Sequence, residues 1–453
     1  MFFRQVLYRD LGCASYVLGD GGQAIVVDPR FDTDVYLEIA LEAGLEIVHV
    51  LDTHEHADHL SGRERLAALT GARAHRPARQ DDRRDSDLEA GQELRVGRVL
   101  VRALATPGHR PEHLALVVSD ASRSSEPWML LSGDSLLVGD LARPDLAVEA
   151  ELGARDLHAS LGTLLELGDH VEVWPAHVGG SLCGGAGLSL KTSSTIGYER
   201  RFNPLLSLPL QEFVQRLTTS IPTRPPNVAV LVEANRRTRE HLPPSPPLLD
   251  AEALARALGD GEVTVLDARD PLSFDEGHID GALNLPVSAS ALGTRAGWAL
   301  RPHEQIVIVA DEQWRADAMT RALQAVGLWR ILGVALDWAQ LPATREGALS
   351  LEALADGLRK RSLALVDVRE AEEWRSGHVE GSIHLPLGRL GNGRELDVEP
   401  PRGTIAVACA AGARAAFAAS LLRRGGWRDV VRVAGGGVGG LLAYDIPLIG
   451  GAA

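Results

Sequence analysis

Short apolar runs followed at once by polar residues recur through the first part of the chain. Ser15–Leu18 and Ala24–Pro29 flank the turn residues Gly19–Gly22, and this pattern predicts a β-hairpin. Four later runs have the length and composition of buried strands. They are Ile47–Leu51, Val99–Ala105, Trp128–Leu131 and Val171–Val173. We therefore expect a sheet whose strands end in polar loops.

Side chains that bind metals follow all four of these runs, and four of them lie within six residues after the first run. The set consists of His54, His56, Asp58, His59, His109, Asp134 and His177. Imidazole and carboxylate groups are ligands of zinc and of iron(II). Because each group follows a strand, all should project from one edge of a sheet toward one point. The pattern predicts a metal site rather than a polar loop with scattered histidines.

The second half of the chain contains a repeat. The segments Leu266–Arg269, Gly277–Gly281 and Leu285–Pro286 recur about one hundred residues later as Val366–Arg369, Gly377–Gly381 and Leu385–Pro386. Self-similarity at this spacing indicates two copies of one domain rather than a short-period solenoid. Each copy alternates short apolar runs with helical stretches, which predicts a small α/β domain with a mostly parallel sheet.

These patterns divide the chain into four predicted parts. Residues 1–235 form the metal-binding domain, and the proline-rich residues 236–249 form a semi-rigid linker. The two copies of the α/β domain occupy residues 250–345 and 346–453. A chain of 453 residues with 45% hydrophobic residues is long enough for several hydrophobic cores.

Charge and cysteine content narrow the function classes. The net charge of −15, without a basic block, argues against nucleic-acid binding. No run reaches membrane-spanning length, and we expect no signal peptide because Met1–Gln5 is not followed by a long apolar stretch before a cleavage site. Three cysteines do not suggest a disulfide framework, so a reducing cytoplasm is the expected location.

A candidate nucleophile lies in the second copy. Cys409 and Arg414 enclose a loop between the strand-like run Ile405–Ala408 and the helical run Ala415–Arg423. The loop consists of Ala410, Ala411, Gly412 and Ala413. Backbone N–H groups at a helix N-terminus favour an anion and hence the thiolate form of a cysteine. Arg414 can bind an oxyanion or stabilise the loop.

The corresponding loop of the first copy has no nucleophile. Alignment of Ile306–Arg315 on this loop places Ala310 at the position of Cys409, and Arg315 at that of Arg414. Alanine has no nucleophilic group, so the first copy is predicted to be a catalytically silent spacer or docking domain.

The metal motif resembles that of the metallo-β-lactamase superfamily position by position. The similarity covers roughly the first half of the chain, including the predicted hairpin. It implies an αββα sandwich for the first domain. It does not identify the reaction, because one fold supports many chemistries.

The repeated D-x-R and G-H-[IV]-[DE]-G-x-[IL]-x-L-P patterns look like the rhodanese family. This resemblance implies α/β domains with central parallel sheets. It assigns a framework role to Asp267, Arg269 and His278, and to Asp367, Arg369 and His378. Four residues separate Cys409 from Arg414, as in sulfurtransferases, whereas related phosphatases carry five. The loop side chains are small, whereas many thiosulfate-using relatives carry a basic or hydroxyl residue there. The identity of the sulfur donor is therefore left open.

The order of the domains is similar to that of bacterial persulfide dioxygenase–rhodanese fusions over almost the whole chain. Further matching segments are Ser132–Asp140, Arg143–Asp145 and Ser194–Arg200. The resemblance implies one Fe(II) per chain, held by His54, His109 and Asp134. It places His56, Asp58, His59 and His177 around this centre or on its substrate side.

The same resemblance implies the reaction and the assembly. A small-molecule thiol persulfide and O₂ would give sulfite and a thiol, and Cys409 would transfer sulfur between persulfide, sulfite and thiosulfate in either direction. Tethering the two sites raises their effective concentration. A homodimer or homotetramer is implied as well.

Two other functions stay open at this point. A binuclear zinc hydrolase of the hydroxyacylglutathione hydrolase type would use all seven candidate ligands, with a bridging hydroxide as nucleophile. The attached sulfur-carrying thiol has no obvious role in such an enzyme. A sensor in which Cys409 reports persulfides to a partner is the non-enzymatic alternative.

The other two cysteines, Cys183 and Cys13, have fewer possible roles. Cys183 lies six residues after His177 in a glycine-rich segment, so it is either a sulfur acceptor near the metal or a small loop residue. Cys13 is expected to be a buried packing residue.

Overall fold

The computed structural model describes the chain apart from residues 80, 81, 83, 85, 86, 180, 182, 186, 220, 222, 223, 238–242, 260–262, 289, 290, 339, 340, 395 and 451–453. The described residues form two compact units. Unit 1 contains residues 1–222, 228–242 and 325–327, and unit 2 contains residues 223–227, 243–324 and 328–453. The predicted limits 1–235, 236–249, 250–345 and 346–453 stay predictions, and residues 238–242 of the predicted linker lie outside the described ones.

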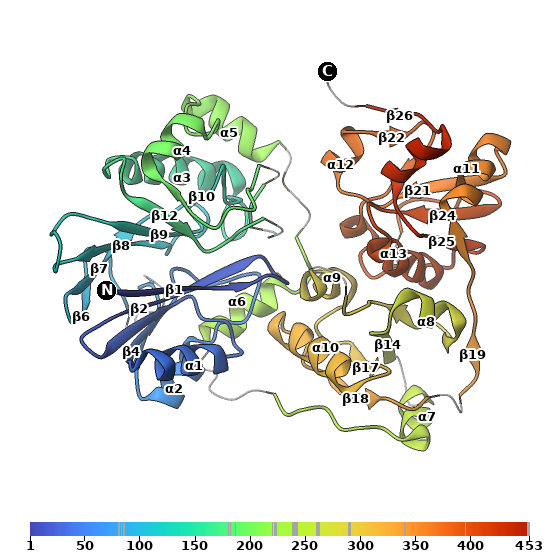
Figure 1. The fold of residues 1–453 in the computed structure, drawn as a ribbon, viewed down its shortest axis with the longest axis horizontal. Helices are drawn as coiled ribbons and strands as arrows, with labels where there is room; N and C mark the ends of the chain where they lie inside the picture. Colours follow the sequence, from blue (N-terminus) through green and yellow to red (C-terminus); the bar gives the residue numbers. More distant parts are fainter. Residues whose placement is uncertain are drawn as a thin grey trace. The chain divides into compact units, whose positions relative to one another are not determined.

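Two sheets face each other in unit 1 (Figure 1). The first sheet has the order β1(Phe2–Tyr8), β2(Cys13–Asp20), β3(Gln23–Val27), β4(Glu46–Leu51), β5(Arg73–His75). The second has the order β13(Ser194–Thr195), β12(Glu172–Pro175), β9(Met129–Gly133), β8(Leu114–Asp120), β7(Val99–Ala105), β6(Glu93–Val96). A small hairpin joins β10(Leu136–Leu137) to β11(Asp140–Leu141).

The predicted hairpin is confirmed as β2 and β3. Asp20 pairs with Gln23, so Gly21 and Gly22 form a two-residue turn. Their φ angles are 64° and 82°, and a turn with two positive φ angles suits the right-handed twist of paired strands. Only glycine adopts such angles without steric penalty.

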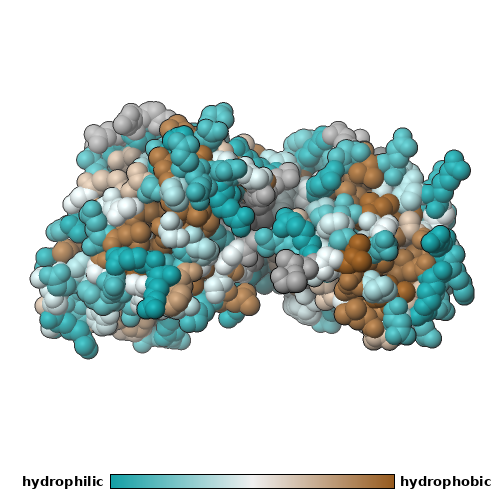
Figure 2. All heavy atoms as spheres, turned by 90° about the horizontal axis from the view of Figure 1, so that it is seen from above, coloured by the Kyte–Doolittle hydropathy of each residue, from teal (hydrophilic) through white to brown (hydrophobic). Residues whose placement is uncertain are grey.

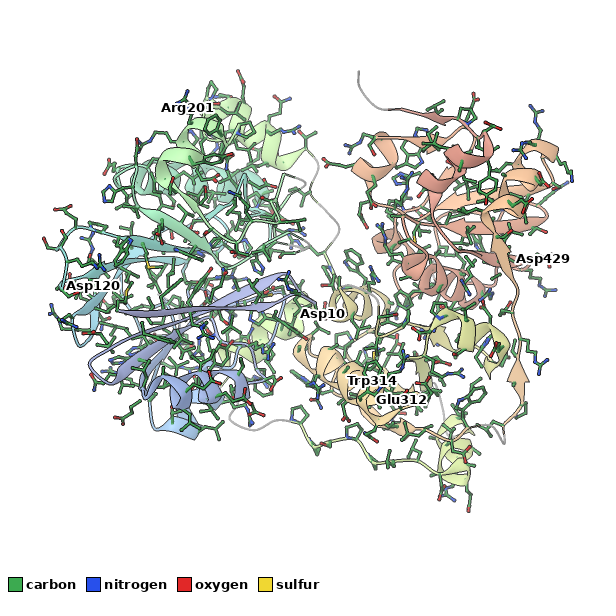
Figure 3. All side chains as sticks on the ribbon, in the orientation of Figure 1. Asp10, Asp120, Arg201, Glu312, Trp314 and Asp429 are labelled. Carbon is green, nitrogen blue, oxygen red and sulfur yellow. The ribbon has the colours of Figure 1, made fainter. Side chains whose placement is uncertain are left out.

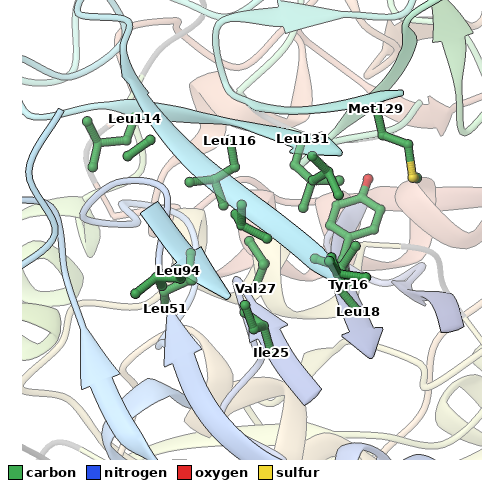
Figure 4. Packing of buried hydrophobic residues seen from close by; sticks show 14 of the residues in the cluster. Tyr16, Leu18, Ile25, Val27, Leu51, Leu94, Leu114, Leu116, Met129 and Leu131 are labelled. Carbon is green, nitrogen blue, oxygen red and sulfur yellow. The ribbon is translucent and has the colours of Figure 1, made fainter. Parts of the chain in front are cut away.

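The core between the two sheets follows from the period of two along each strand. Ala14, Tyr16 and Leu18 of β2 point toward the second sheet, whereas Val17 points to the opposite face. Leu116 and Leu131 of the second sheet meet them, as Figure 4 shows. Removing these side chains from water is the main contribution to the stability of the sandwich.

Helices cover both outer faces of this sandwich (Figure 1). α1(Asp34–Ala43) and α2(Arg63–Thr70) pack on the first sheet, and α3(Ala150–Leu164) and α5(Leu210–Thr218) pack on the second. Leu157, Leu161 and Leu164 lie on one face of α3 at helical spacing and are buried. Two further helices are α4(Ile196–Phe202) and α6(Val228–Arg236). The predicted αββα sandwich is confirmed.

Unit 2 contains two parallel sheets, as predicted. The first has the order β16(Leu283–Asn284), β14(Val263–Asp267), β17(Gln305–Val309), β18(Ile331–Ala335). Its helices are α7(Ala251–Gly259), α8(Pro271–Glu276), α9(Leu292–Ala299) and α10(Gln313–Ala325). The second has the order β20(Ala348–Ser350), β25(Val430–Ala434), β24(Thr404–Ala408), β21(Leu363–Asp367), β23(Ile383–His384). Its helices are α11(Leu351–Lys360), α12(Ala371–Arg375) and α13(Ala413–Arg424).

The framework role predicted for the repeated Asp, Arg and His is confirmed in both copies. Arg369 binds the Asp367 carboxylate at 2.7 Å and donates to the Gly377 carbonyl at 2.8 Å. His378 Nδ1 lies 2.9 Å from the Trp374 carbonyl. In the first copy the same bonds join Asp267, Arg269, Gly277, His278 and Phe274. These side chains hold the loop after the first strand of each copy.

The surface is mixed in polarity. On the face shown in Figure 2, apolar residues are interspersed with polar ones. Among the described residues, no helix combines the length and the apolar character needed to cross a membrane.

The sandwich core gives a stability prediction. Replacing Leu116 by alanine should destabilise the β7–β9 region by about 2–5 kcal/mol, because it removes buried methyl groups and leaves a cavity. Leu41→Ala, at a side chain that is 83% exposed, should change stability by less than about 0.5 kcal/mol. Hydrogen exchange of the β8 amides measures both effects, and equal protection in the two variants would contradict the assigned core.

Candidate metal centre and sulfur-transfer loop

Three of the predicted metal-binding side chains converge in unit 1. His109 Nε2 lies 3.3 Å from Asp134 Oδ2, and His54 Nε2 lies 3.8 Å from the same oxygen. The three donor atoms lie within 4.8 Å of one another. All three residues are fully buried.

The strands that position these side chains belong to both sheets. His54 follows β4 of the first sheet, whereas His109 and Asp134 follow β7 and β9 of the second. The expectation that all candidates project from one edge of a single sheet was therefore wrong. The ligand loops instead meet at one end of the sandwich, because strand ends from two facing sheets lie close together there.

The donor atoms fit a bound cation. His54 Nε2, His109 Nε2 and both Asp134 carboxylate oxygens are buried without a hydrogen-bond partner. Buried polar atoms without partners are rare and costly. Two imidazole nitrogens and a carboxylate aimed at one point are a donor set that a divalent transition metal satisfies.

Hydrogen bonds on the far side of each ring orient the two histidines. His109 Nδ1 lies 2.9 Å from the Arg143 carbonyl, so Nδ1 carries the proton and Nε2 presents its lone pair. His54 Nδ1 lies 3.0 Å from Thr53 Oγ1, whose own proton goes to the Asp28 carboxylate at 2.9 Å. Burial lowers the pKa of both His54 and His109, which favours the neutral, ligating form.

Asp134 is held by a histidine that the sequence analysis missed. Its backbone N–H donates to His113 Nε2 at 2.8 Å, while His113 Nδ1 contacts Thr106 Oγ1 at 2.7 Å. Burial lowers the pKa of His113 to about 4, consistent with a neutral acceptor ring. A Cβ atom on Gly133, which has a φ of 53°, would lie 2.5 Å from His113 Nε2. The local signal was the pair of histidines four residues apart at 109 and 113.

The other residues of the histidine-rich loop are close by, and each contacts a charged or imidazole group of the protein. His56 Nε2 lies 3.2 Å from Asp28 Oδ1, and His59 Nδ1 lies 3.1 Å from Asp58 Oδ1. Burial opposes protonation of His56, yet the Asp28 hydrogen bond and nearby carboxylates raise its pKa to about 9. The donor atoms of His56, Asp58 and His59 also lie within 4.8 Å of one another, so a second cation is geometrically possible.

His177 lies between these two groups. Its Nε2 atom is 3.3 Å from Asp134 Oδ2 and 3.5 Å from Asp58 Oδ2. Burial alone would lower the pKa of His177, but Asp134, together with other nearby anionic groups, raises it well above the usual value. Ser181 Oγ contacts His177 Nδ1 at 2.9 Å.

Both cysteines of unit 1 are near this region. Cys13 is buried, as expected, and its Sγ also lies 3.1 Å from Asp58 Oδ2. The Cys183 sulfur lies within 4.8 Å of the donor atoms of Asp134 and His177. Burial raises the pKa of Cys183 to about 12, which disfavours the nucleophilic thiolate at neutral pH.

A buried ionic cluster braces the ligand loops from outside. Glu55 Oε2 accepts hydrogen bonds from Arg110 at 3.2 Å, Arg79 at 3.0 Å and Arg236 at 2.9 Å. Asn235 of α6 donates to the carbonyls of His56 at 2.8 Å and His59 at 2.9 Å. Sequence analysis did not identify this cluster, because its partners lie up to 181 residues apart.

The Cys409 loop of unit 2 has the predicted strand–loop–helix arrangement. Cys409 follows β24, and α13 begins at Ala413. The Gly412 N–H donates to Cys409 Sγ at 3.0 Å, and Gly412 adopts a φ of 101° that favours glycine. A backbone N–H aimed at the sulfur stabilises a negative charge there.

Arg414 binds a carboxylate of its own domain. Its two terminal nitrogens donate to the two oxygens of Glu373 on α12, at 2.5 and 2.7 Å. The sequence analysis expected Arg414 either to bind an oxyanion or to stabilise the loop. The bonds to Glu373 correspond to the second role.

The loop of the first copy also lies between a strand, β17, and a helix, α10, but it contains no cysteine. Ala310 occupies the position of Cys409, and Arg315 donates to Asp270 at 2.8 Å. Trp314 Nε1, at the start of α10, donates to Glu312 at 2.7 Å, and both residues are labelled in Figure 3. With a methyl group where the second copy has a thiol, this loop has no nucleophile.

Comparisons with known families agree with this arrangement. Residues 8–177 match the model of the metallo-beta-lactamase superfamily, and residues 250–338 and 350–441 each match that of the rhodanese-like domain. A crystal structure of a metallo-beta-lactamase from Staphylococcus aureus subsp. aureus COL is 29% identical, with a TM-score of 0.66. The match covers 74% of this chain and 98% of that one.

Two kinds of characterised relative match the first domain. The mitochondrial persulfide dioxygenase ETHE1 of Bos taurus is 30% identical over 236 residues, which are 51% of this chain and 86% of that protein. A hydroxyacylglutathione hydrolase of Gloeobacter violaceus is 34% identical over 158 residues, covering 34% of this chain and only 58% of that protein. The longer match and the domains that follow it agree: the chain belongs to the persulfide dioxygenase family of the metallo-β-lactamase superfamily and carries two rhodanese-like domains after its metal-binding module.

Proposed function

We propose that this chain is an iron(II)-dependent persulfide dioxygenase coupled to a sulfurtransferase. The unpartnered donor atoms of His54, His109 and Asp134 are the observation that carries the first activity. Two histidines and one carboxylate are the ligand set of many non-haem iron(II) oxygenases. An iron(II) ion held there would supply the electron transfer that lets O₂ oxidise the terminal sulfur of a persulfide.

The reaction balances as R–S–S⁻ + O₂ + H₂O → R–SH + SO₃²⁻ + H⁺. The protein's own residues orient the metal-binding side chains and limit the access of water to them. Thr53 and the Arg143 carbonyl fix the tautomers of His54 and His109, and Asp134 is placed by His113. The ligand side chains are fully buried, so charges in the site act at a low effective dielectric.

His56, Asp58 and His59 support the single-metal assignment. Asp28 holds His56 through Nε2, while Asp58 and His59 bind each other. His56 Nε2, Asp58 Oδ1 and His59 Nδ1 are thus engaged with protein groups. His56 Nδ1 and His177 Nε2 are buried without a hydrogen-bond partner, as are the donor atoms of His54, His109 and Asp134. The same residues, with His177, would be needed as ligands in a binuclear zinc hydrolase.

The sulfurtransferase half rests on the Cys409 loop. A persulfide on Cys409 would react as Cys409–S–S⁻ + SO₃²⁻ → Cys409–S⁻ + S₂O₃²⁻, so the sulfite made at the metal site becomes thiosulfate. The reverse reaction loads Cys409 from thiosulfate and passes sulfur to a thiol. The Gly412 N–H stabilises the thiolate formed in the forward direction.

Alanine at His54, His109 or Asp134 should remove the metal and abolish persulfide-dependent O₂ uptake, because each loses one of three ligands. Metal analysis of protein purified without added zinc, with O₂ uptake on glutathione persulfide, tests this. The wild type should contain one iron per chain, and His59→Ala should keep it. Two zinc ions per chain and no O₂ uptake would instead favour the hydrolase.

Asp28→Asn should weaken metal binding about 10–100-fold, since it replaces an acceptor that orients the loop around His54 and His56. Asparagine tolerates the φ of 51° at this position, so the backbone is preserved. Affinity is measured by competition with a chelator. Asp32→Asn, at a side chain that is 44% exposed, is the matched control. Equal affinities of the two variants would contradict the role of Asp28.

Cys409→Ala should keep O₂ uptake and sulfite formation but lose thiosulfate formation. Product analysis by ion chromatography separates the two activities. Cys183→Ser tests the proposal that Cys183 accepts sulfur, and unchanged product ratios in that variant would remove it. Loss of O₂ uptake in Cys409→Ala would show that the two activities are not separate.

A further inference from the structure

We propose that Glu373 determines how strongly the Cys409 loop accepts sulfur oxyanions, by competing with them for Arg414. The proposal rests on the sulfurtransferase function of Cys409. Sulfite and thiosulfate are dianions, whereas a thiolate acceptor carries a single charge. The affinity of the loop for the dianions therefore depends on which positive groups are available to them.

Arg414 is the only charged side chain of the loop, because the four residues between it and Cys409 are alanine or glycine. It is engaged through both terminal nitrogens with Glu373, at 2.5 and 2.7 Å. The Arg414 side chain is 17% exposed and that of Glu373 is 36% exposed. A bidentate pair in this partly buried position is stronger than an ordinary surface ion pair.

Glu373 is itself held in place. It forms a capping box with Glu370 at the start of α12, and the Glu370 N–H donates to Glu373 at 3.0 Å. The carboxylate is therefore presented to Arg414 by a fixed helix end rather than by a mobile side chain. Burial of Glu370, with repulsion from Glu373, raises the pKa of Glu370, although Arg414 and Arg295 act in the opposite sense.

A dianion that binds at Cys409 through the Arg414 guanidinium would replace the Glu373 carboxylate with its own oxygens. Transfer of the terminal sulfur of Cys409–S–S⁻ to a thiolate, R–S⁻, gives R–S–S⁻ and Cys409–S⁻ and requires no such exchange. Glu373 is thus a specificity-determining residue that raises KM for oxyanions. It does not touch the sulfur that is transferred.

Glu373→Gln removes the negative charge and keeps the shape of the side chain. With thiosulfate as donor and cyanide as acceptor, this variant should show a KM for thiosulfate about three- to tenfold below the wild type, with kcat within about twofold. Glu372→Gln is the matched control, since Glu372 is the adjacent residue on α12 and lies near Arg375 instead. Glu373→Asp keeps the charge and should retain the high KM.

A second measurement does not need turnover. Sulfate should slow the alkylation of Cys409 by iodoacetamide, and half-protection should need three- to tenfold less sulfate in Glu373→Gln than in Glu372→Gln. Equal KM values and equal protection in these two variants would overturn the proposal. A wild type that transfers no sulfur, with sulfate protection still dependent on Glu373, would reject the sulfurtransferase function but retain the role of Glu373.

Discussion

The Asp28 carboxylate fixes the loop that carries His54, the first candidate metal ligand. It accepts hydrogen bonds from the Thr53 N–H at 2.6 Å and from the Thr53 hydroxyl, and Asp28 has a φ of 51°. Such a backbone angle is disfavoured for a residue with a side chain and persists only where surrounding contacts hold it. Asp28 donates its own N–H to the Leu51 carbonyl at 2.8 Å, so the pairing of β3 with β4 supplies that support. The orientation of His54 thus depends on the register of two neighbouring parallel strands.

Burial of an unpartnered donor set is tolerable only in a strongly stabilised scaffold. Each buried polar atom without a partner destabilises the fold by about 1–3 kcal/mol. The two sheets offset this through the apolar core between them, in which Tyr16, Leu116 and Leu131 are almost fully buried. A cation bound there would satisfy the same atoms and would couple metal binding to the folding of this end of the sandwich. The hydrogen bonds of Glu55 to three arginines oppose separation of the loops.

Local patterns sufficed for the strands, the hairpin and the residues that could bind a metal or carry sulfur. Each of these is encoded within about ten neighbouring residues, where side-chain periodicity and turn chemistry act. The two-sheet origin of the ligand loops was missed, because an apolar run does not say which sheet it joins. His113, Asn235 and Glu373 were missed for a related reason. Their roles arise from contacts with partners that are 21, 179 and 41 residues away, and nothing in their immediate neighbours specifies those contacts.

The first rhodanese-like copy contacts α13, the helix that follows the Cys409 loop. The helix begins beside the nucleophile, and its other end is held by the first copy, where Arg424 reaches Glu304 at 3.4 Å and Thr264 at 2.9 Å. On the same helix, Ser420 accepts the Asn284 N–H at 3.2 Å. Removing one partner of a buried polar contact leaves the other uncompensated, so such contacts fix geometry even where they add little net stability. A copy with alanine at the position of Cys409 can therefore still fix the position of the helix that follows Cys409.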